Sequence, residues 1–96
     1  MRNEITEKLK KYFSEIKVRF KVKKIGVFGS QIKGRTKKRS DIDILVEFEK
    51  GFKTFDNYME LKFYLEDVFK CRVDLVLKNA LKEGIKSYIL EEVVYV

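Results

Sequence analysis

The segment spanning residues 41–48, Asp-Ile-Asp-Ile-Leu-Val-Glu-Phe, restricts the possible fold more than any other part of the sequence. Its apolar residues alternate with others, as in a β-strand whose side chains point to opposite faces in turn. One face would bear Ile42, Ile44, Val46 and Phe48. The opposite face would bear Asp41, Asp43, Leu45 and Glu47. Both aspartates would therefore point the same way from a single strand.

The rest of the chain shows helical and strand patterns around this segment. Apolar residues recur at helical spacing in three stretches, and short apolar, partly β-branched runs indicate two further strands. We expect helices over residues 3–16, 54–70 and 85–92, and strands over 22–28 and 72–77. The apolar tail 93–96 would either pack against the chain's own sheet, which we favour, or form a docking edge for a partner. This order of elements predicts an α/β domain.

Length and hydrophobic content limit the organisation of the chain. With 96 residues, 45% of them hydrophobic, the sequence can bury one core, so we expect a single domain over residues 1–96. No apolar run reaches the length of a membrane span, and Met1–Lys11 lacks the apolar core of a signal peptide. We therefore expect a soluble, cytoplasmic protein with no membrane partner.

The chain contains one cysteine, Cys71, and no histidine. An internal disulfide is impossible, and the usual zinc ligand sets and histidine-based catalytic triads are excluded. Cys71 borders an apolar stretch and is expected to be a small buried residue, not a nucleophile. Any chemistry must depend on carboxylates, hydroxyls, lysines or arginines.

Basic residues outnumber acidic ones by 22 to 15, which gives a net charge of +7. Such a balance favours polyanionic partners, such as nucleotides, nucleic acid or an acidic protein surface, but it also fits an ordinary solvated surface. None of the known groove-reading motifs is present, and the aromatic residues fall at core spacings. Nucleic acid is therefore not expected to be the primary partner.

Three features of the sequence together indicate a catalytic site. Gly29-Ser30 follows a predicted strand, and such a turn exposes backbone N–H groups and a hydroxyl that can hold phosphate oxygens. Ten residues later comes the Asp41-x-Asp43 pair. Two like charges so close repel each other unless a cation lies between them or one is protonated. Magnesium, which prefers oxygen ligands and substrate phosphates, is the natural cation, and Asp74 on the last predicted strand could supply a third carboxylate.

These residues resemble the signature of the polymerase-beta-like nucleotidyltransferase superfamily, and the short length is similar to its minimal (MNT) branch. The resemblance implies an α+β fold in which a small mixed β-sheet has helices packed on one face. It also implies that Gly29 and Ser30 hold the nucleoside triphosphate, while Asp41, Asp43 and Asp74 bind magnesium, expected as two ions. Asp74 would in addition help to activate the acceptor hydroxyl.

Minimal members of this superfamily resemble antitoxins that transfer AMP from ATP to a tyrosine of a HEPN-type ribonuclease toxin. The resemblance thus implies a hetero-oligomeric partnership with such a toxin. The sequence departs from the pattern of many minimal members in two places. Gln31 follows Gly-Ser, and the loop after it contains the basic residues Lys33, Arg35, Lys37, Lys38 and Arg39. This basic loop could clamp phosphates or simply face water.

Three other functions stay open at this point. The chain could be an antitoxin that neutralises its toxin only by forming a complex, with the acidic site unused. It could bind nucleic acid, or it could modify a small molecule, although the absence of a second domain speaks against the latter. A 96-residue chain has little surface left to enclose a second substrate, so a protein that presents its own hydroxyl is the favoured acceptor.

Overall fold

The structure is a computed structural model that describes residues 4–28 and 42–96. In chain order its elements are α1 (Glu4–Phe20), β1 (Val22–Phe28), β2 (Ile42–Phe48), α2 (Phe55–Phe69), β3 (Val73–Leu77), the 3-10 helix η2 (Lys78–Ala80), α3 (Glu83–Glu92) and β4 (Val94–Tyr95). No helix among these residues is long and apolar enough to cross a membrane.

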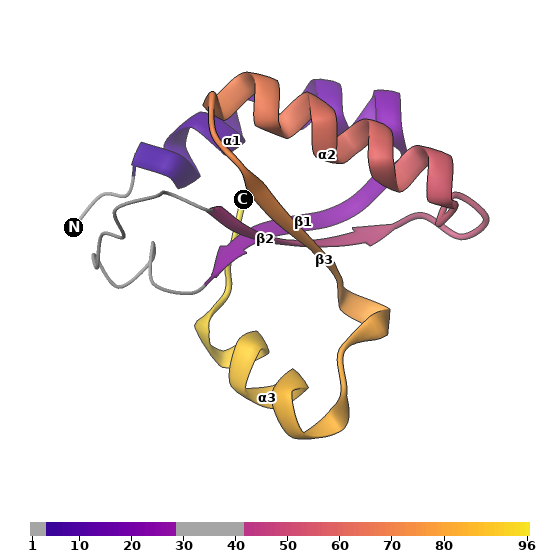
Figure 1. Cartoon of the computed structure of the whole chain (residues 1–96), viewed down its shortest axis with the longest axis vertical. Coiled ribbons are helices and arrows are strands. Elements are labelled where there is room, and N and C mark those ends of the chain that lie inside the picture. Colours follow the sequence, from indigo (N-terminus) through magenta and orange to yellow (C-terminus); the bar gives the residue numbers. More distant parts are fainter. Residues whose placement is uncertain (1–3, 29–41) are drawn as a thin grey trace.

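The four strands form one mixed sheet in the order β3-β2-β1-β4. β1 is antiparallel to both β2 and β4, whereas β2 and β3 are parallel. α1 and α2 lie on one side of this sheet and α3 lies on the other side (Figure 1). The α+β fold with a small mixed sheet is confirmed, and the expected packing of helices on one face holds for α1 and α2.

The core lies between the sheet and these two helices. Ile42, Ile44 and Val46 are at most 3% exposed, as the alternation along β2 predicts. The helices contribute their apolar stripes to the same cluster: Leu9, Ile16 and Phe20 from α1, and Leu61 and Leu65 from α2. Burying a side chain of this size stabilises the fold by about 1.5–3 kcal/mol. These residues therefore bury one face of the sheet under α1 and α2. The opposite face of the sheet is not covered by these two helices.

Two features determine where α2 begins and ends. The hydroxyl of Thr54 accepts a hydrogen bond from the Asn57 N–H and caps the first turn. At the other end Lys70 adopts a left-handed conformation, with φ 57°, and its N–H donates to the Glu66 carbonyl. These local signals match the predicted range of residues 54–70.

The C-terminal tail forms a strand, which confirms that it packs against the chain's own sheet. Val94 and Tyr95 pair with Val27 and Gly26 of β1, although both remain more than 40% exposed. This close approach requires the glycine. A Cβ built on Gly26 would lie 2.8 Å from both the Val93 Cγ2 and the Val94 carbonyl oxygen.

Candidate active site

Two of the three predicted metal-binding aspartates lie side by side. In the parallel pairing of β2 with β3, Asp43 is the register partner of Asp74. Neighbouring strands are about 4.8 Å apart, and register partners project to the same face. The flanking residues Ile42 and Val73 are at most 3% exposed and belong to the core cluster, so both aspartates project from the opposite face.

The two carboxylates differ in exposure. Asp43 lies on a central strand and is partly buried, whereas Asp74 is exposed. β3 is the last strand on its side of the sheet, so a second substrate could reach Asp74 from beyond the sheet edge. The backbone here is held firmly, since the Ile42 N–H donates to the Arg72 carbonyl at 3.0 Å.

The other predicted site residues, Gly29, Ser30 and Asp41, lie outside the described residues. The described residues on either side of this segment show where it leaves β1 and where it enters β2. Phe28, which immediately precedes Gly29, is the register partner of Asp43 on β2. Ile42, which immediately follows Asp41, pairs with Val73 on β3. Residues 29–41 therefore connect two strand ends that border the Asp43–Asp74 pair.

Farther along the same face, Glu47 forms an ion-pair cluster that the sequence did not predict. Its carboxylate lies 3.5 Å from the Lys78 Nζ and 4.0 Å from the Lys23 Nζ. Between Glu47 and Asp43 lies Leu45, only 1% exposed although it shares their face. The alternation in 41–48 places Glu47 beside the aspartates, but its partners come from β1 and η2. Only the three-dimensional pairing reveals them.

Magnesium is the metal that the donor set suits. The pair supplies carboxylate oxygens without any nitrogen or sulfur ligand, which matches a hard cation that shares its coordination with substrate phosphates. Within residues 4–28 and 42–96 no group of three potential ligands occurs. Asp41, the third predicted ligand, lies outside those ranges.

Comparison with known proteins agrees with this geometry. The sequence matches the nucleotidyltransferase domain family over residues 7–96. The chain belongs to this family. A curated relative, protein adenylyltransferase MntA of Thermococcus cleftensis, is 47% identical over 93 residues, which span 97% of this chain and 93% of that protein. The chain is thus a nucleotidyltransferase and a homologue of MntA.

Solved structures show the same fold. A protein assigned as a minimal nucleotidyltransferase superposes with a TM-score of 0.81 at 30% identity, covering 98% of this chain and 95% of that one. A chain from a toxin–antitoxin complex with AMP-PNP gives a TM-score of 0.71 at 22% identity, covering 88% of this chain and 69% of that one. A chain from a complex of tri-AMPylated Shewanella oneidensis HEPN toxin with MNT antitoxin gives 0.66 at 19% identity, covering 95% and 70%. At such identities the last two support the nucleotidyltransferase fold alone.

Proposed function

We propose that this chain is a magnesium-dependent protein adenylyltransferase that transfers AMP from ATP to a hydroxyl, expected to be a tyrosine, of a HEPN-type toxin, and thereby acts as its antitoxin. The observation that carries the proposal is the register of Asp43 with Asp74 on neighbouring parallel strands. The name of the MntA relative supports the reaction, and the AMPylated toxin complex among the fold neighbours supports the partner.

Each site residue has a role in this proposal. Gly29 and Ser30 hold the triphosphate through backbone N–H groups and the serine hydroxyl. Asp41, Asp43 and Asp74 hold magnesium through their carboxylate oxygens. When bound, magnesium would offset the charge of the triphosphate and of the departing pyrophosphate.

The transfer itself is a displacement at the α-phosphorus of ATP. The acceptor hydroxyl oxygen forms the new bond to phosphorus, the bond to the bridging oxygen of pyrophosphate breaks, and pyrophosphate leaves. Asp74 is the carboxylate that can take the hydroxyl proton, because it is exposed and lies on the edge strand. Asp43 is more enclosed and is better suited to holding the cation alone.

The test is to compare Asp43→Asn and Asp74→Asn with the unmodified chain. Each variant is incubated with the HEPN-type toxin, ATP and magnesium, and toxin-bound AMP is measured by mass spectrometry. We expect transfer to fall by more than about 100-fold, since even residues that only orient a metal ligand cost 10- to 100-fold when changed. Glu49→Gln, an exposed carboxylate just beyond the other end of β2, should retain full activity.

A non-catalytic antitoxin is the alternative, and the same variants separate it from the enzyme. Toxin activity is assayed after incubation with each variant and ATP. If Asp74→Asn transfers no AMP yet neutralises the toxin as well as the unmodified chain does, complex formation alone is the function. If neutralisation is lost together with transfer, the adenylyltransferase is supported.

A further inference from the structure

The outer surface of α2 bears a row of exposed apolar side chains. Phe55 is 75% exposed and Phe63 is 58% exposed, with the partly buried Met59 between them. These residues follow one another at four-residue spacing, so they line up along one side of the helix. We call these three residues the α2 ridge. Phenylalanines this exposed on a small chain indicate a surface that contacts another molecule.

Charged residues lie beside the ridge. The exposed carboxylates of Asp56 and Glu60 are four residues apart on one side of it, and Asp67, also exposed, pairs with Lys70 at 3.5 Å. The Tyr58 hydroxyl donates to the Leu75 carbonyl, and the Glu66 carboxylate accepts from the Val73 N–H at 3.1 Å, so α2 is held against β3. Glu66 follows Phe63 by three residues and therefore continues the line of the ridge toward β3.

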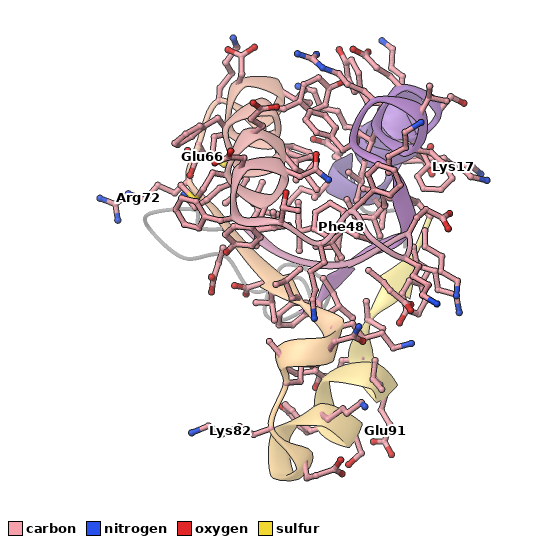
Figure 2. The ribbon with its side chains drawn as sticks, turned by 90° about the vertical axis from the view of Figure 1, so that its right-hand side faces the viewer. Lys17, Phe48, Glu66, Arg72, Lys82 and Glu91 are labelled. Atoms are coloured by element: carbon pink, nitrogen blue, oxygen red, sulfur yellow. The ribbon has the colours of Figure 1, made fainter. Side chains whose placement is uncertain are left out.

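The ridge lies beside the edge at which an acceptor hydroxyl would arrive. α2 packs against β3, the edge strand that bears Asp74. Figure 2 shows Glu66 of α2 and Arg72, just before β3, on one side of the molecule, with Lys17 of α1 on the other side. A partner lying along the ridge could extend past the C-terminal end of α2 toward Asp74.

β3 itself is a poor site for adding a strand. On the outer side of β3, the Val73 N–H already donates a hydrogen bond to the Glu66 carboxylate. On the same side, the Leu75 carbonyl already accepts one from the Tyr58 hydroxyl. A partner at this edge would have to displace both side chains before it could form a sheet ladder. The surface that remains available is the helix face.

The charges indicate the chemistry of the partner. Although the whole chain has a net charge of +7, the exposed carboxylates of Asp56 and Glu60 border the ridge. The Lys62 Nζ, which lies 6.0 Å from the centroid of the Phe63 ring, is paired with Glu66. A complementary surface would combine apolar side chains with lysine or arginine around them. A second copy of this chain fits less well, because its basic helix α1 offers only Val18 as a large exposed apolar side chain.

We infer that the α2 ridge is the docking surface for the acceptor protein, and that this partner binds it with an apolar patch flanked by basic residues. The inference rests on the proposed function, since it assigns a surface to the protein whose hydroxyl is modified. Docking on the ridge would set the distance between that hydroxyl and Asp74.

The test compares two double variants with matched exposure. Phe55→Ser with Phe63→Ser alters the ridge, and Val18→Ser with Tyr88→Ser alters residues that are 70% and 61% exposed elsewhere. Binding of the purified HEPN-type toxin is measured by calorimetry. We expect the ridge variant to bind more than about 10-fold more weakly, as for central aromatic contacts, and the control to bind normally. The KM for toxin should rise by the same factor while the KM for ATP stays constant.

A charge variant and the oligomeric state complete the test. Glu60→Lys should weaken binding, and the effect should be larger at low salt. Equal toxin binding by the ridge variant and the unmodified chain would overturn the inference. So would a free chain that sediments as a dimer and becomes a monomer when the ridge is altered. If the unmodified chain binds toxin through the ridge but transfers no AMP, only the proposed function fails; if it does not bind toxin at all, both fail.

Discussion

At the scale of single residues, Gly26 shows how the lack of a side chain at one position allows β4 to pair closely with β1. Replacing it with alanine places a methyl group 2.8 Å from the Val93 Cγ2 and from the Val94 carbonyl oxygen. Because one of these neighbours is backbone, β4 must shift away from β1. We expect Gly26→Ala to lower the free energy of unfolding by about 1–3 kcal/mol, measured by urea denaturation.

Gly84 provides the matched control for this prediction. It lies in α3, and a Cβ built there meets nothing within 4 Å. Gly84→Ala should therefore leave stability unchanged or raise it by up to about 1 kcal/mol through helix propensity. Equal stability of the two variants would show that β4 does not need the close approach at Gly26.

At the scale of elements, Glu66 joins α2 to the outer edge of β3. Its carboxylate accepts hydrogen bonds from the Lys62 Nζ at 2.8 Å and from the Val73 N–H at 3.1 Å. These bonds, first that of Lys62 and then that of Val73, lower the pKa of Glu66 below its usual 4.5. The carboxylate thus stabilises the fold when it is ionised.

The pH dependence follows from the direction of that shift. A lowered folded-state pKa contributes stability that is complete above 4.5 and is lost as the pH falls through the folded value. We expect Glu66→Gln to cost about 0.5–1 kcal/mol at neutral pH, and this difference to shrink as the pH falls below 4.5. Urea denaturation at several pH values measures it. Asp67→Asn, whose carboxylate is 83% exposed, should show little change at any pH.

Local patterns predicted most elements closely, and the errors have local causes. β1 was predicted at its observed bounds, and α2 and β3 within one residue at each end. α1 continues to Phe20, four residues beyond the predicted end at Ile16. Phe20 follows Ile16 by four residues and continues the buried stripe, whereas Val18 lies on another side of the helix and is 70% exposed. α3 begins at Glu83, two residues before the predicted start at Ile85, because its first two residues, Glu83 and Gly84, are not apolar and so do not extend the helical apolar pattern.

The site required information that no local pattern contains. Alternation along the strands predicted which way Asp43 and Asp74 point, but not that β2 and β3 are neighbours in parallel register. That pairing depends on α2 crossing from one strand to the next over the core. The partners of Glu47 and the pairing of β4 with β1 were likewise invisible, because each joins segments far apart in the chain. The nucleotide-binding roles of Gly29 and Ser30 and the metal-binding roles of Asp41, Asp43 and Asp74 stay predictions.

At the scale of the whole molecule, the candidate site brings two carboxylates together on a well-packed sheet. A sheet whose other face is well packed places two carboxylates in register on adjacent strands, where like charges repel. Proteins accept such a cost where a ligand removes it. In the proposed function this ligand is a divalent cation. Such a cation would bind the folded chain and not the unfolded one, and would therefore raise the melting temperature.

The variant Asp74→Asn separates the repulsion between the two carboxylates from the stabilisation by a bound cation. In metal-free buffer it should match or exceed the unmodified chain in stability, by up to about 1 kcal/mol, because the repulsion is relieved at an exposed position. With ATP and increasing magnesium, the melting temperature of the unmodified chain should rise while that of the variant stays nearly constant. Differential scanning calorimetry, with Glu49→Gln as a carboxylate control, measures both. A variant that is less stable without metal, yet gains as much from magnesium as the unmodified chain, would mean that Asp74 supports the fold and not the cation.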